Sequence, residues 1–128
     1  MTSKDRLIFN EYRACQLAGS FPSLRQAPGI QPWEPARLDA WAETQNDPGT
    51  VYAARFVLEV WNQHQEWQCG RFSISDAMYV WDEAHREAFR QWARCPYRFY
   101  GDSDARPGTQ TILRILMIEN AGNVVSSL

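Results

Sequence analysis

The chain has 128 residues, the size of one domain. Apolar residues make up 45% of it and charged residues 22%, a balance that excludes collagen-like and disordered proteins. Its 13 basic and 15 acidic side chains give a net charge of −2, so it lacks the positive field of a general nucleic-acid or membrane-surface binder. We expect one domain over residues 1–123 and a loose tail over residues 124–128.

The N-terminal pattern predicts a first helix over about Lys4–Ala18. Ser3 is placed to cap it, and Gly19 is placed to end it in the left-handed conformation. The segment Gly19–Trp33 carries three prolines and a further glycine, which predicts a long surface loop. The expected inward face of the helix consists of Ile8, Tyr12 and Cys15.

Two further helices are expected in the middle of the chain. Pro35 suits the first turn of a helix that ends near Gln45. A turn then offers Asp47 or Thr50 as the cap of a third helix that runs to about Gln68, before Gly70. Its broad apolar face predicts a central, enclosed helix, and comprises Tyr52, Ala53, Phe56, Val57, Val60, Trp61, His64 and Trp67.

A fourth helix is predicted from Ser73 to Arg94, because Ser73 and Asp76 have the spacing of a helix cap and Pro96 disfavours helix at Cys95. Its expected apolar face comprises Met78, Trp81, His85, Ala88, Phe89 and Trp92. After a loop, residues 109–121 are expected to form a last helix, or alternatively a strand that pairs with residues 97–100 as a hairpin. The predicted fold is all-α, with four or five helices around a Trp-rich core.

The sequence indicates a cytosolic location. Its longest uninterrupted apolar run has five residues, against the ~20 needed to cross a bilayer, so we expect no membrane segment and no signal peptide. Cys15, Cys69 and Cys95 are an odd and widely spaced set, typical of free thiols in a reducing compartment. Lys4 is the only lysine, a bias that fits a GC-rich coding genome and indicates a bacterial source.

Two histidines are candidates for chemistry. His64 and His85 are each expected on the buried face of a long helix, where they can meet as a zinc site with a cysteine or as an acid and base pair. The chain has neither a Cys-x-x-Cys nor a His-x-x-x-His pair, so we expect hydrogen-bonded core histidines, with no metal and no cofactor.

Other catalytic motifs are absent or incomplete. Asp82 to His85 spell a helicase signature, but the chain has no phosphate-binding glycine loop with its lysine. It also lacks a Gly-x-Ser-x-Gly nucleophile motif. Cys69 and Cys95 are expected at C-terminal helix ends, where the helix dipole disfavours a thiolate, and Cys15 is expected in the core. We therefore expect no catalytic function.

A cluster at the end of the fourth helix is the candidate binding surface. Arg86, Arg90 and Arg94 recur every fourth residue, but Asp82, Glu83 and Glu87 share their face and predict intrahelical ion pairs. Tyrosine and arginine are enriched in protein interfaces, although Tyr97 and Phe99 can equally cover the core. The candidate partner-binding residues are Arg90, Arg94, Tyr97, Arg98, Phe99 and Tyr100.

These features predict a small, non-catalytic protein that binds a protein partner, such as an accessory or inhibitor protein carried by bacterial mobile elements. One alternative is a nucleic-acid-binding regulator that uses the arginines of the fourth helix. A further alternative is a small helical enzyme that uses His64 and His85. The sequence assigns no oligomeric state.

Overall fold

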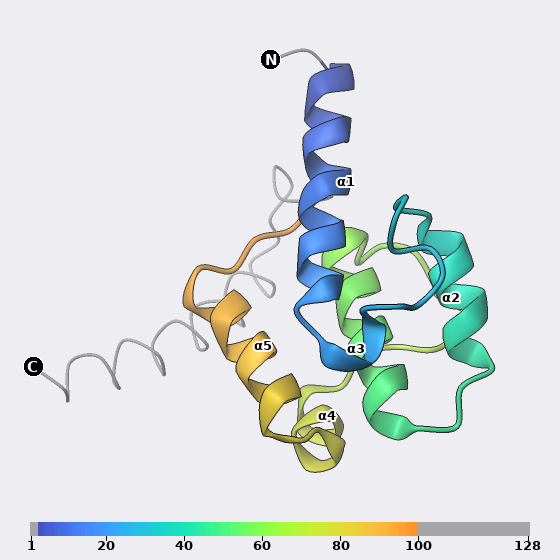
Figure 1. Ribbon diagram of the computed structural model, residues 1–128, viewed down its shortest axis with the longest axis vertical. Coiled ribbons are helices and arrows are strands. Elements are labelled where there is room, and N and C mark those ends of the chain that lie inside the picture. The colour runs from blue at the N-terminus through green and yellow to red at the C-terminus, as the bar shows by residue number, and fades with distance from the viewer. Residues whose placement is uncertain (1–2, 100–128) are drawn as a thin grey trace, which may run out of the picture.

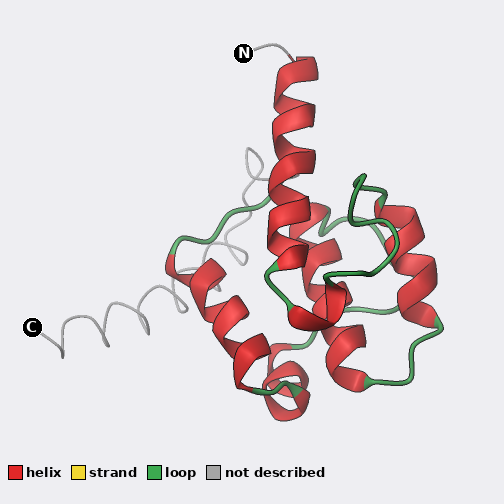
Figure 2. Ribbon diagram, in the orientation of Figure 1, coloured by secondary structure: helices red, strands yellow, loops and turns green. Residues whose placement is uncertain are grey.

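The computed structural model describes the backbone of residues 3–99 and the side chains of residues 8–99. This part of the chain contains helices and no strand (Figure 2). Its elements are α1 (Ser3–Gly19), the short 3-10 helix η1 (Pro22–Leu24), α2 (Pro35–Glu43), α3 (Pro48–Trp61), α4 (Ile74–Val80) and α5 (Glu83–Arg94). The predicted all-α fold is confirmed, whereas the segment predicted over residues 109–121 and the tail predicted over residues 124–128 lie outside the described residues.

Helix α3 is the central element, as predicted. It contacts α1, η1, α2 and α4, and lies between α2 and α5 in Figure 1. The Asp47 carboxylate caps its first turn by accepting hydrogen bonds from the backbone N–H of Thr50 (3.1 Å) and from its hydroxyl (2.6 Å). Pro48 occupies the first turn, where its missing N–H costs no hydrogen bond.

An aromatic cluster fills the space between α3, η1 and α5. Phe56 on α3 lies at its centre, with ring centroids 5.0–6.4 Å from those of Phe21, Phe72, Trp81, Phe89 and Trp92. Four of the six tryptophans are buried, which confirms the predicted Trp-rich core: Trp33, Trp61, Trp81 and Trp92. Rings of this size dominate core energetics because each buries a large apolar area.

The predicted inward face of α1 is wrong. Ile8 and Tyr12 are 57% and 60% exposed, and Cys15 is only partly buried. The N-terminal half of α1 projects beyond the other helices, so only its C-terminal half reaches the core (Figure 1). The core residues of α1 are Ala14, Leu17 and Ala18.

The segment predicted as a surface loop between α1 and α2 is instead part of the core. Phe21, Leu24, Ile30 and Trp33 are all buried. The chain turns tightly at Gly29, whose φ of 84° favours glycine, and a Cβ atom there would lie 2.6 Å from a backbone oxygen. Prolines and glycines therefore shape this segment without keeping it at the surface.

Helix α3 ends at Trp61 rather than near Gln68. The Asn62 side-chain oxygen accepts a hydrogen bond from a backbone N–H two residues later, a local bond that competes with helix. The Asp39 carboxylate of α2 accepts hydrogen bonds from the N–H groups of Gln68 (2.9 Å) and Cys69 (2.8 Å), which holds the following loop against α2. The predicted helix positions His64 and Trp67 lie in this loop.

The predicted fourth helix is two helices. α4 starts at the predicted Ser73 cap, whose hydroxyl accepts the Asp76 N–H, and the chain becomes extended at Trp81. Asp82 then caps α5 by accepting the backbone N–H of His85 (2.9 Å). The predicted apolar face is otherwise confirmed, because Trp81, His85, Ala88, Phe89 and Trp92 are buried and Met78 is partly buried.

Helix α2 begins at Pro35 as predicted and ends at Glu43, slightly before the predicted Gln45. No helix within residues 3–99 is long and apolar enough to cross a membrane.

Candidate functional site

The arginines of α5 are engaged by neighbouring groups of the same chain. Arg90 forms ion pairs with Glu83 and with Glu87 (3.0 Å), and Arg94 lies 3.7 Å from Glu87. The Arg86 guanidinium donates two hydrogen bonds to a backbone carbonyl of α4. The predicted intrahelical ion pairs are therefore present, and they offset the positive charge that the nucleic-acid alternative requires.

The aromatic residues after α5 fold back onto the helices. The Tyr97 ring lies 6.4 Å from that of Trp92, and the Arg13 guanidinium lies 3.8 Å from its centre. The Phe99 ring packs 5.4 Å from that of Trp61. Burial raises the pKa of the Tyr97 hydroxyl. Both rings are partly buried against the core, so their main role in the fold is to shield it from solvent.

Two further candidate residues have different positions. Arg98 is partly buried and interacts electrostatically with Glu59, whose carboxyl pKa is raised by burial although the charges of Arg98 and Arg71 oppose that shift. Tyr100 lies outside the described residues.

The two histidines occupy different environments. His64 is exposed in the loop after α3, so the prediction that it is buried on a helix is wrong. His85 is buried on α5, as predicted. Within the described residues, no group of three or more His, Cys, Asp or Glu side chains is placed to hold a metal ion.

The three cysteines are free thiols. Cys69 is buried in the loop before α4 rather than at a helix end, and its burial and the nearby Asp39 carboxylate raise the pKa of its thiol to about 12. Burial and Glu11 raise the pKa of Cys15, and its thiol donates to a backbone carbonyl. Cys95 is exposed at the end of α5. Because the thiolate is the nucleophilic form, Cys15 and Cys69 are poor nucleophiles.

An open hollow of about 200 Å³ lies between α1 and α5, and we name it the α1–α5 groove. Its floor includes the buried side chains of Leu17 and Trp92. None of the described residues that line it is charged: Gln16, Leu17, Ser20, Ala88, Gln91, Trp92 and Tyr97. Among the described residues, Tyr97 is thus the one predicted partner-binding residue that lines this groove.

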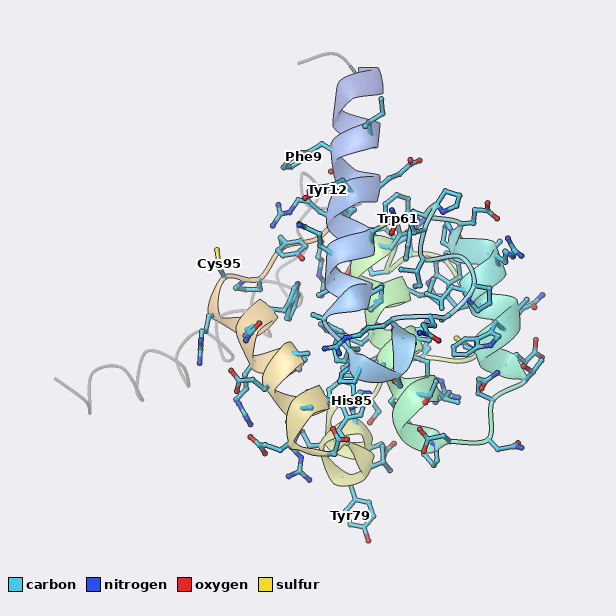
Figure 3. The ribbon with its side chains drawn as sticks, viewed as in Figure 1. Phe9, Tyr12, Trp61, Tyr79, His85 and Cys95 are labelled. Carbon is cyan, nitrogen blue, oxygen red and sulfur yellow. The ribbon has the colours of Figure 1, made fainter. Side chains whose placement is uncertain are left out.

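The exposed face of α1 leads into the same groove. Ile8, Phe9 and Tyr12 are 57%, 49% and 60% exposed, and Figure 3 shows Phe9 and Tyr12 on the projecting part of the helix. Ile8, Tyr12 and Gln16 recur every fourth residue, so they follow one face of α1, and Gln16 donates to the Tyr12 hydroxyl (2.9 Å). The sequence pattern does not reveal this surface, because helical spacing alone predicts Ile8 and Tyr12 on the inward face of the helix.

A second candidate site is a set of three hydrogen-bonded side chains that connects η1 to α5. The Ser23 hydroxyl lies 2.7 Å from Nε2 of His85, and Nδ1 of the same ring lies 2.8 Å from Oδ1 of Asp82. The His85 ring lies beside those of Phe21 (5.9 Å) and Trp81 (6.3 Å). Figure 3 shows His85 on the side of α5 that faces η1. Ser23 was missed as a candidate because it is 62 residues away in sequence.

Comparison with known proteins finds no relative of this chain. No protein-family model matches the chain, and neither a curated protein nor a solved structure matches it.

Proposed function

We propose that this protein is a small interaction protein, and that an amphipathic helix of a protein partner docks in the α1–α5 groove. The observation that supports the proposal is the exposed apolar face of α1, which continues into a groove lined by uncharged residues. Exposed apolar patches of this kind often mark interaction sites. Helices commonly bind in such grooves through apolar side chains spaced three and four residues apart.

The side chains of the groove indicate what kind of partner surface can dock there. Ala84, Ala88 and Gln91 share one side of α5 by their spacing, and Ala88 and Gln91 line the groove. Small side chains allow a second helix to approach closely, and the described residues that line the groove carry no charge. The docking face of the partner is therefore mainly apolar, and the Arg13 guanidinium, which lies over the Tyr97 ring, is a nearby charge that it can meet.

The proposal includes the setting predicted from the sequence. The protein is a cytosolic accessory or inhibitor protein of a bacterium, of the kind that mobile elements carry. Three free cysteines suit a reducing compartment, and the single lysine suits a bacterial source.

Site-specific photo-crosslinking in the native host tests the proposal. A photoreactive amino acid replaces Gln91 or Tyr12 beside the groove, and Glu43 at the exposed end of α2 as the control. We expect the two groove positions to capture the same protein, identified by mass spectrometry, and the Glu43 position not to capture it. Equal capture from Glu43 would contradict the proposal.

Affinity measurements with the captured protein complete the test. Truncation of a central aromatic residue commonly costs 2 kcal/mol or more of binding free energy, so Phe9→Ala and Tyr12→Ala should each weaken binding by about thirtyfold. Both residues are about half exposed, so the melting temperature should change little. Unchanged affinity in both variants would exclude the α1 face as the docking surface.

A further inference from the structure

The hydrogen bonds around His85 determine where its proton lies. The carboxylate oxygen Oδ1 of Asp82 accepts the backbone N–H of His85, which holds the pKa of that carboxyl below its ordinary value. An ionised carboxylate can only accept, so the nearby Nδ1 atom must donate. In the neutral ring Nε2 then carries the lone pair and accepts, which leaves the Ser23 hydroxyl as the donor to it.

We propose that Ser23 is a nucleophile that accepts acyl groups from small neutral carboxylic esters, with His85 as its general base. A hydroxyl that donates to an imidazole, whose other nitrogen donates to a carboxylate, has the proton arrangement of a serine nucleophile with its base and orienting acid. Asp82 is the positioning residue, since it acts through the ring of His85.

Rigid elements hold the three groups. Asp82 is the cap of α5, and its carboxylate binds both the backbone and the ring of His85. The buried ring of His85 packs beside the two aromatic rings of Phe21 and Trp81. Ser23 belongs to η1, between the buried side chains of Phe21 and Leu24. Such support keeps the reacting atoms within hydrogen-bond distance.

The reaction is hydrolysis in two steps. The Ser23 oxygen forms a bond to the ester carbonyl carbon, His85 takes the hydroxyl proton and passes it to the leaving alkoxide, and an alcohol departs. Water then attacks the acyl-serine with His85 again as base, which releases the carboxylic acid and restores Ser23. Ser23 is only partly exposed, which favours small esters, and the exposed Asp82 carboxylate on the other side of the His85 ring disfavours anionic ones.

The first test uses the unmodified protein. It is incubated with p-nitrophenyl acetate and, separately, with a fluorophosphonate probe, and the labelled serines are mapped by mass spectrometry. General-base assistance commonly contributes 10²-fold or more, so Ser23 should be labelled about 10²-fold faster than Ser20, whose hydroxyl donates to the backbone carbonyl of Leu17 instead of to an imidazole. Equal labelling of Ser23 and Ser20 would overturn the proposal.

The second test uses Asp82→Asn. Asparagine is as good a helix cap as aspartate and keeps an oxygen acceptor for Nδ1, but it removes the charge that stabilises a protonated ring. We expect the labelling rate of Ser23 to fall at least tenfold and the midpoint of its pH profile to move to lower pH, with α5 still folded by circular dichroism. An unchanged rate and pH profile would mean that the three residues only connect η1 to α5.

Discussion

Single residues that connect distant segments determine much of this fold. Asp39 is a buried carboxylate on α2, and it accepts the backbone N–H groups of Gln68 and Cys69 across about 30 positions of sequence. A buried charge is stable only where hydrogen bonds replace its lost hydration. Asp39 therefore both needs this loop and holds it in place.

Replacement of Asp39 by alanine should lower the free energy of unfolding by about 3 kcal/mol, because two buried N–H groups lose a charged acceptor. Urea denaturation measures the change. Glu43→Ala, an exposed carboxylate on the same helix, is the matched control and should change stability by less than about 0.5 kcal/mol. Similar losses in both variants would show that the loop does not depend on Asp39.

Because of Asp82, the free energy of unfolding should vary with pH in the acidic range. The backbone N–H of His85 is the main cause that lowers the pKa of its carboxyl in the folded protein. A carboxyl with a lowered folded pKa stabilises the protein above its unfolded pKa of about 4, and this contribution disappears as the pH falls through the folded value. The stability difference between the wild-type protein and Asp82→Ala should thus be full at pH 6 and shrink below pH 4 in urea titrations. A constant difference would be inconsistent with the ionised cap.

At the scale of the elements, the break between α4 and α5 places two helices where the pattern predicts one. The extended residue Trp81 ends α4 and Asp82 starts α5, and this turn directs the Trp81 ring toward Phe21 (5.3 Å) and Phe56 (6.4 Å). Its indole N–H donates to the Gly49 carbonyl (3.0 Å), which connects the break to the first turn of α3.

Trp81→Ala should cost about 3 to 5 kcal/mol of stability, because the ring is 2% exposed and its removal leaves a large cavity. Tyr79, two residues earlier on α4, is 88% exposed, so Tyr79→Ala should remain within about 0.5 kcal/mol of the wild-type protein. Chemical denaturation of both variants measures the contrast. Near-normal stability of Trp81→Ala would refute its place in the core.

At the C-terminal end of α5, the loss of an ion pair and the loss of a packed ring should have different effects on stability. Arg94→Glu removes an exposed ion pair and should change stability by less than about 1 kcal/mol. Tyr97→Ala removes a partly buried ring that packs on Trp92 and under Arg13, and should cost about 2 kcal/mol. Thermal melting compares the two. If Tyr97→Ala melts like the wild-type protein, the ring does not cover the core.

At the scale of the whole molecule, the helices surround one aromatic core that extends from Trp33 and Trp61 to Trp92. Stability in the described residues comes from this packing and from side chains that bind distant backbone groups, such as Asp39. The N-terminal half of α1 projects from the molecule (Figure 1), and its exposed apolar side chains Ile8, Phe9 and Tyr12 add surface rather than core.

Removal of metal ions should not affect the folded state. Within residues 3–99 no cluster of potential ligands is placed to bind a metal, so folding does not need one there. Incubation with a chelator should leave the melting temperature unchanged, and elemental analysis should find no stoichiometric zinc. One zinc per chain, with a lower melting temperature after chelation, would refute this expectation.

The sequence by itself determined the features that depend on neighbouring residues. The caps at Asp47 and Ser73, the first-turn proline of α2 and the buried face of α5 follow from rules that act over a few positions, and each is present. The buried position of His85 was predictable for the same reason, because helical periodicity placed it on the apolar face.

Only the tertiary structure decided which apolar residues are buried and which side chains meet. Leu24 is buried from a proline-rich segment, Ile8 is exposed on an amphipathic helix, and Ser23 reaches His85 across 62 positions. Local patterns carry no information on these outcomes, because burial depends on which elements pack together. Hydrogen bonds between distant residues form only after the helices have packed, so the groove and the Ser23 arrangement are properties of the folded chain.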